Sequence, residues 1–441
     1  MAEEFRDLER SNLPQFNTPG PAWRNWGEAR MRLATRIQLS AMMFLQFFIW
    51  GAWYATGGNY MKSRGMTDII YLAYLASPIG SIVAPFFLGM IADRLFPVQK
   101  VLGVMHVLSG LFVVAAPLVA EGPSASRWLF LAALLLHMLC YMPTVGLAMA
   151  TAFHLLKNKE REFPLVRVFG TLGWIAAGIL VSYLLQGDTT ALPMYVAGAG
   201  GLVMGIYSFT LPNVPPPGAG KDFSFRDIVG LDALSELGSR PFVIFMLSVM
   251  LTSIPLATYF AYVPVFLRDA GIPNPAFKMT FGQMSEVVCL LLLPWFFMQL
   301  GVKRVLIAGM LAWIVRYALF ALGAPDAVAW MLVLGVCLHG PCYDFVYVAG
   351  QVYVDRKASP RIRAQAQGLF VLATYGVGQG LGTLAAGWIF NAIMPAAAGA
   401  PTLGQWQTFW IVPLGFAAIV TALFVAGFRE ETRPLAAAAP L

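Results

Sequence analysis

Long apolar stretches alternate with short charged ones along almost the whole chain. A helix needs roughly 20 apolar residues to cross a bilayer, and each of these stretches is long enough. No charged residue occurs from 364 to 428, so that run holds two spans, divided by the Pro/Gly/Ala-rich segment 395–404. The pattern predicts twelve spans, at about 37–61, 69–92, 101–120, 128–155, 163–185, 192–211, 242–267, 280–300, 305–322 and 327–354, with two more inside 364–428.

One polar connection is longer than the others and divides the spans six and six. It contains a Pro-Pro-Pro-Gly string and seven charged residues. We therefore expect an all-α membrane protein whose twelve transmembrane helices form two pseudo-symmetric six-helix bundles, a layout typical of transporters with a central site. The expected segments are an amino-terminal tail (1–36), a first bundle (37–211), an inter-bundle loop (212–240), a second bundle (241–428) and a carboxy-terminal tail (429–441).

The charge balance fits a membrane protein rather than a nucleic-acid-binding one. Only 12% of the residues are charged, about half the share of a soluble domain. If the amino terminus is inside, 22 of the 29 Lys and Arg residues fall inside, five fall outside, and Arg167 and Arg316 lie within spans. The positive-inside rule then places both termini in the cytoplasm and explains the net charge of +7.

The remaining composition argues against cofactors and covalent crosslinks. The four cysteines lie in apolar runs and form no CxxC pair, so neither a zinc site nor a disulfide framework is expected. No glycosylation sequon occurs, which is consistent with a bacterial inner membrane. We expect a monomer in the lipid bilayer with no cofactor, no metal and no nucleic-acid partner.

The most unusual stretch, 339–347, lies inside the span at 327–354 and reads His-Gly-Pro-Cys-Tyr-Asp-Phe-Val-Tyr. Asp344 is the sole charged residue of that span, and a carboxylate at such depth costs about 2.5–3.5 kcal/mol on insertion scales. His339 and Tyr343 lie on one helical stripe, with Asp344 at its edge. Pro341 removes a backbone donor and favours a kink. The stretch therefore predicts part of a binding site.

A second candidate face lies in the span at 163–185. Arg167, Thr171 and Trp174 recur at intervals of four and three residues, so they share one side of a helix. Two readings of Arg167 stay open: an inward-facing cation, or a side chain that extends to the headgroups at the cytoplasmic end.

The span at 280–300 offers Gln283 and Glu286, three residues apart. An amide and a carboxylate on one face suit ribose-type hydroxyls, which need both donors and acceptors. The alternative is a structural ion pair between Glu286 and Arg316, since buried charges are usually paired. Arg316 itself is interpreted as structural.

Other aromatic and histidine residues carry weaker signals. Trp50 and Tyr54 are more readily explained as packing or interface residues than as site residues. His106 and His137 are interpreted as structural or interfacial.

Several strings resemble a known family. Gly89-x-x-x-Asp93-Arg94 is similar to the loop motif of the major facilitator superfamily. More specific strings resemble the nucleoside:proton symporter family, the bacterial nucleoside permeases, over nearly all of 36–429. They are Phe44–Gly51, Tyr141–Thr144, Arg167–Gly173, Gln283–Glu286, Ala312–Arg316, Tyr343–Phe345 and Arg363–Gly368.

The resemblance implies a nucleoside cavity lined by matching positions, namely Arg167, Thr171, Gln283, Glu286, Tyr343 and Asp344, with Trp174 as an aromatic wall. The chain departs from the family at three places. Ala257 and Phe260 stand where relatives supply amides, and His339 stands where a Tyr is expected. Fewer base-reading hydrogen bonds imply broader or different substrate specificity.

We therefore expect a proton-coupled nucleoside importer working by alternating access. The proton-coupling acid is Asp344 or Glu286, with Asp344 preferred. The rivals are a proton-coupled transporter of another small hydroxylated solute such as a sugar, and a non-transporting sensor on the same fold. An intramembrane aspartic protease lacks its second Asp, and no HExxH zinc motif occurs, so we expect no enzyme.

Overall fold

The computed structural model describes residues 22–87, 95–157, 159–216, 230–359, 361–395 and 399–429. Several predicted features lie wholly or partly outside these residues. They are the two tails, the end of the span at 69–92, the Gly89–Arg94 motif, residues 217–229 of the loop at 212–240 and residues 396–398 of the segment at 395–404.

The first part of the described chain is helical, and its elements follow the predicted spans. They are α2 (Ala22–Tyr54), α3 (Gly57–Ser63), η1 (Thr67–Ile69), α4 (Ile70–Phe87), α5 (Val98–Ala120), α6 (Arg127–Leu155), α7 (Lys159–Gly178), η3 (Ile179–Leu184), α8 (Leu192–Ser208) and the short α10 (Leu231–Leu237).

The second part is also helical, and two of its spans contain π-helical turns, η4 and η5. Its elements are α11 (Arg240–Asp269), α12 (Pro275–Gly323), α13 (Ala329–Cys337), α14 (His339–Tyr343), η4 (Asp344–Val348), α15 (Ala349–Lys357), α16 (Arg363–Val371), η5 (Leu372–Gly378), α17 (Gln379–Ile393) and α18 (Leu403–Gly427).

Helix α12 consists of two spans in series. Gly301 has non-helical dihedrals (φ 71°, ψ 169°), which only glycine adopts at little cost. The break falls between the predicted spans at 280–300 and 305–322. When α12 counts twice, α13–α15 as one bent span, and the shorter α8 is included, the described helices make twelve apolar crossings.

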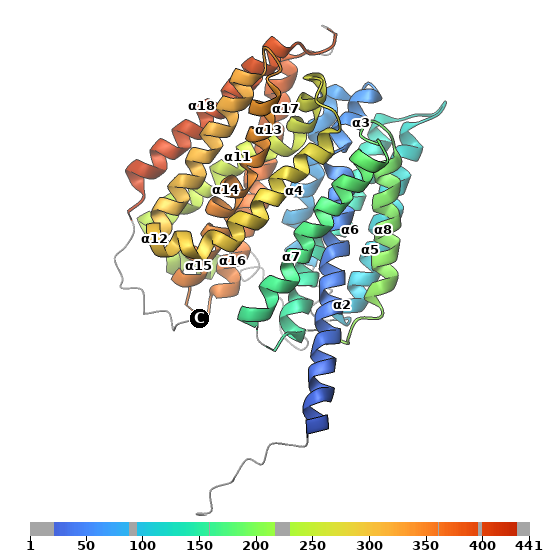
Figure 1. Cartoon of the computed structure of the whole chain (residues 1–441), viewed down its shortest axis with the longest axis vertical. Helices are drawn as coiled ribbons and strands as arrows, with labels where there is room; N and C mark the ends of the chain where they lie inside the picture. The colour runs from blue at the N-terminus through green and yellow to red at the C-terminus, as the bar shows by residue number, and fades with distance from the viewer. Residues whose placement is uncertain are drawn as a thin grey trace, which may run out of the picture.

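The helices pack as two sets, and the chain returns to the end from which it starts. Helices α2, α4, α5, α6, α7 and α8 pack against one another, and so do α11, α12, α14, α17 and α18. Figure 1 shows the start of α2 and the end of α18 at the same end of the molecule, as an even number of crossings requires. We call the opposite end, where α3 lies, the far end.

The outer surface carries large apolar side chains that are highly exposed, which is unfavourable in water. Leu291 and Met298 of α12 and Ile206 of α8 are 73%, 76% and 69% exposed. Large contiguous apolar surfaces mark contact with another molecule or with lipid. Together with helices long and apolar enough to cross a membrane, these side chains make this a multi-pass membrane protein.

Small residues allow helices to approach closely within the first set. A Cβ added at Gly173 of α7 would lie 2.1 Å from the Phe44 carbonyl oxygen of α2. Lipid offers no hydrophobic drive for helix association, so such close van der Waals contact holds spans together.

Several hydrogen bonds join the two sets at the far end. Asn59 Nδ2 donates to the Pro264 carbonyl oxygen at 3.1 Å, and Lys62 pairs with Asp269. Asp188 accepts from the backbone amide of Ala276, at the start of α12, at 3.1 Å. Burial raises the pKa of the Asp188 carboxyl, and its hydrogen bonds offset part of that desolvation. These contacts close the far end.

We expect Gly173→Ala to destabilise the protein, because overpacking against a backbone atom typically costs about 1–3 kcal/mol. A thermal melt in detergent should show a fall of several degrees. Gly415→Ala in α18 is the matched control, because a Cβ there meets nothing within 4 Å and should leave the melt unchanged. Equal melts for the two variants would contradict the packing argument.

Removal of the Asp188 carboxylate should loosen the far end. On a cysteine-free background, spin labels at Ser124→Cys and Ala400→Cys, which are exposed far-end positions in the two sets, report their separation. We expect Asp188→Ala to lengthen and broaden the distance distribution. Asp326→Ala, at an exposed far-end position, is the control and should not. An unchanged distance distribution for Asp188→Ala would show that the other contacts between the two sets are enough to hold the far end together.

Candidate functional site

Glu286 of α12 has neighbours from both helix sets. Thr171 Oγ1 of α7 donates to Glu286 Oε1 at 3.3 Å. On the other side, His339 Nε2 of α14 lies 3.8 Å from Glu286 Oε2. The Glu286 side chain is only 14% exposed, so its charge depends on these neighbours. A residue predicted as a site candidate thus has contacts from both sets.

Two glycines bring α12 and α14 close enough to form this centre. A Cβ at Gly282 would lie 2.9 Å from His339 Cβ, and one at Gly340 would lie 2.5 Å from the Ser285 carbonyl oxygen. The amide of Gly340 also donates to Ser285 Oγ at 2.8 Å. This close approach sets Glu286 against His339.

The span that contains Asp344 is bent, as its sequence predicts. Its two parts, Ala329–Cys337 and His339–Lys357, meet at 41°. Pro341 lacks an amide hydrogen, so the helix cannot continue with full bonding there. A π-helical turn, η4, begins at Asp344.

Asp344 is buried without a hydrogen-bond partner among the described residues. It is 1% exposed, and neither carboxylate oxygen has a partner there. The charges of Glu286 and Arg167 both act on it. An unpaired carboxylate in this setting is costly, so the position favours a proton or a ligand that supplies donors.

Arg167 is half-buried in α7 and lies close to α2. Its charge acts on Glu286 and on Asp344. Its guanidinium carbon lies 4.3 Å from the centre of the Phe47 ring of α2, a cation–π contact. Of the two readings of this residue, these interactions favour the inward-facing one, which stays a prediction.

Aromatic rings connect the two sets beside these charges. Trp174 lies 5.5 Å from Trp50 and 6.1 Å from Phe260 between ring centres. Phe260 lies 5.6 Å from His339, which lies 5.5 Å from Tyr343. Trp50, interpreted from sequence as a packing residue, therefore stands next to Trp174, a site candidate.

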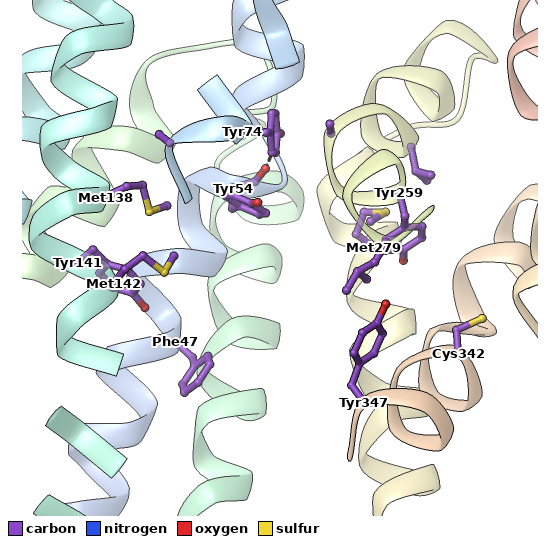
Figure 2. Packing of buried hydrophobic residues seen from close by; sticks show 14 of the residues in the cluster. Phe47, Tyr54, Tyr74, Met138, Tyr141, Met142, Tyr259, Met279, Cys342 and Tyr347 are labelled. Atoms are coloured by element: carbon purple, nitrogen blue, oxygen red, sulfur yellow. Dashed lines mark hydrogen bonds between the residues drawn. The ribbon is translucent and has the colours of Figure 1, made fainter. Parts of the chain in front are cut away.

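We call this series of rings (Trp50, Trp174, Phe260, His339 and Tyr343) the aromatic wall. It also includes Tyr54, interpreted from sequence as a packing residue. Its ring lies 6.2 Å from that of Trp174 and 5.7 Å from that of Phe260. Figure 2 shows Phe47 and Tyr54 in the first set, with Tyr259 and Tyr347 of the second set across from them.

Gln283 and Arg316 have different surroundings. Gln283 is 4% exposed, and its Oε1 has no partner among the described residues. Arg316 is fully buried, donates from Nε to the Gly335 carbonyl oxygen at 2.9 Å, and lies 4.1 Å over the Tyr259 ring. Glu286 contacts Thr171 and His339 as described above, so an ion pair with Arg316 is not what holds it.

The sequence missed Tyr375. Its hydroxyl is hydrogen-bonded to that of Tyr343, and the charges of Glu286, Arg167 and Asp344 act on it. No carboxylate or broken-helix signal marks its span in the sequence.

The buried histidines of the first set form a separate network. His106 Nε2 lies 2.8 Å from Gln46 Oε1, and Gln46 Nε2 donates to Thr144 Oγ1 at 2.8 Å. Trp53 Nε1 donates to His137 Nε2 at 3.1 Å. These bonds use Nε2 of each ring within the helix set, which fits the structural role expected for both histidines.

Comparison with known proteins identifies the fold and the family. The model of the nucleoside H+ symporter family matches residues 33–433. A putative nucleoside transporter of Escherichia coli K12, YegT, is 34% identical over 417 residues, 92% of this chain and 96% of that protein. Xanthosine permease of the same organism is 30% identical over 420 residues, 91% and 98% of the two chains.

Among solved structures, the crystal structure of the nucleoside transporter NupG is similar at a TM-score of 0.77 with 27% identity, and the match covers 90% of this chain and 100% of that one. This similarity confirms the predicted fold class, the two six-helix bundles of the major facilitator fold. The chain belongs to the nucleoside H+ symporter family.

Proposed function

We propose that this protein imports nucleosides together with protons across a bacterial inner membrane, with both termini in the cytoplasm. Family membership supports nucleoside–proton symport over transport of a sugar and over a sensor. The distribution of Lys and Arg supports the orientation, which makes the far end periplasmic. The observation that carries the proposal is Glu286, held between Thr171 of one set and His339 of the other.

The charged centre suits the sugar of a nucleoside. Arg167 supplies donors, Glu286 and Asp344 supply acceptors, and the amide of Gln283 supplies both. Two of these side chains, Gln283 and Asp344, have oxygens without partners among the described residues, so a hydroxylated ligand would satisfy buried groups that now lack bonds.

The aromatic wall suits the base. Trp174 and Tyr343 are partly exposed and lie at the two ends of the ring series that runs through Phe260 and His339. A planar base gains by stacking on such faces. At Ala257 and Phe260 the wall offers no amide, so we propose recognition of the base mainly by shape and stacking, with broad base specificity.

Asp344 is the proposed proton carrier. When it is ionised and buried, the desolvation cost is reduced by Arg167, whereas Glu286 opposes a second negative charge. Movement of one helix set against the other would change the distance from Arg167 to Asp344, because the two residues belong to different sets. Access and protonation would thereby be linked, with the far-end ties breaking as the periplasmic side opens.

Asp344→Asn should abolish accumulation driven by a proton gradient, because the amide cannot take up and release a proton. Proteoliposomes with an imposed pH gradient and radiolabelled uridine measure this, and a protonophore should abolish accumulation in the wild type. Nucleoside counterflow, which needs no net proton movement, should persist in the variant. Asp326→Asn is the control. Gradient-driven accumulation by Asp344→Asn would exclude Asp344 as the carrier.

Thr171→Val should weaken nucleoside binding, because it leaves Glu286 without its hydroxyl donor while keeping the side chain's shape. Because this bond orients Glu286 and does not touch the ligand, the uridine Kd should rise by less than the roughly 10- to 100-fold that loss of a direct hydrogen bond to a charged group would cause. Isothermal titration on purified protein measures it. The control is Thr421→Val, a buried threonine that donates to its own helix at Ala417. A Kd equal to that of the control would place Thr171 outside the site.

A further inference from the structure

Tyr375 lies beside the candidate site, although no feature of the sequence predicts this position. It lies in the π-helical segment η5, and its hydroxyl forms a hydrogen bond with the hydroxyl of Tyr343 in α14. Tyr343 and Tyr375 thus come from two different spans and bring their phenols together. We call these two side chains the phenol pair. π-helical turns within α-helices occur frequently at functional sites.

The glycines that flank Tyr375 hold η5 between the two helix sets. A Cβ at Gly376 would lie 2.8 Å from Ile82 Cγ1 of α4, and one at Gly378 would lie 2.5 Å from the Met250 carbonyl oxygen of α11. The segment therefore packs against the first set on one side and against its own set on the other. The position of η5, and with it that of the Tyr375 ring, therefore depends on how the two helix sets pack at their interface.

The phenol pair belongs to the charged centre rather than to the aromatic wall alone. The charges of Glu286, Arg167 and Asp344 act on the Tyr375 hydroxyl. Glu286 and Arg167 also act on that of Tyr343. The two hydroxyls therefore lie within electrostatic range of the groups proposed to meet the sugar.

A count of hydroxyl hydrogens shows that the phenol pair has one O–H left to donate. Each phenol has one O–H and can also accept. A bond between the two hydroxyls uses one hydrogen, so the second hydrogen needs another partner. Both tyrosines are partly exposed, whereas Tyr347 in the same cluster is 1% exposed. The pair is therefore equipped to bind a hydroxyl group, which both donates and accepts.

We propose that Tyr375 contacts a hydroxyl of the pentose and thereby favours nucleosides that carry this hydroxyl over analogues that lack it. The inference rests on the proposed function and adds a residue to the same site. A site built to bond a hydroxyl rejects the analogue without it, because its own polar group is then left unpaired. Specificity for the sugar would thus come partly from the η5 span.

The test compares dissociation constants of uridine and its 2′-deoxy, 3′-deoxy and 5′-deoxy analogues for purified wild type and Tyr375→Phe. The expected result is a rise of about fivefold or more in the Kd of uridine, the size of one lost hydrogen bond. The Kd of one deoxy analogue should stay unchanged, because that analogue already lacks the contact. An equal effect on all four ligands, or no effect, overturns the proposal.

Two further variants keep the test decisive. Tyr262→Phe is the matched control, because Tyr262 is buried in the same helix set, packs on Phe390, and has a hydroxyl with no partner among the described residues. Tyr343→Phe breaks the same phenol pair, so it should single out the same analogue even if Tyr375→Phe folds poorly. Wild-type protein that binds no nucleoside would instead refute the proposed function, which separates that failure from failure of the Tyr375 contact.

Discussion

A charged group inside a bilayer is tolerated only where protein supplies its partners, and Glu286 shows how this chain meets that constraint. Its two oxygens face Thr171 from one helix set and His339 from the other. Neither set alone supplies both neighbours. The charge of Arg167, from the first set, also acts on the two carboxylates of the second set. The contacts of this charged centre therefore depend on the relative position of the two helix sets, as alternating access requires.

Close helix approach makes such a centre possible. Gly282 and Gly340 let α12 and α14 come near enough for Glu286 to meet His339, and the bend at Pro341 precedes the turn that carries Asp344. In water, apolar burial would drive this packing, but among spans in lipid the gain comes from contact and from hydrogen bonds. Small residues are thus as necessary to the site as the charged ones, although no ligand would touch them.

Two side chains of the candidate site keep buried polar atoms without hydrogen-bond partners among the described residues. The histidines of the first set are bonded to neighbours such as Gln46 and Trp53, which suits a fixed scaffold. Asp344 and Gln283, in contrast, keep oxygens without partners among the described residues. Buried groups without partners are costly, so these oxygens are the positions at which the proposed proton and hydroxylated ligand would bind.

The sequence by itself determined the twelve crossings, the boundary between the spans at 280–300 and 305–322, the bend near Pro341 and the candidates that carry charge at membrane depth. Hydrophobic length and isolated charges are local properties, so they can be read along a chain. Only the tertiary structure decided that Glu286 meets His339 rather than Arg316, and that Trp50 and Tyr375 stand at the site. Aromatic residues abound in membrane spans, and which of them face the centre depends on helix rotation and close packing, which no single span encodes.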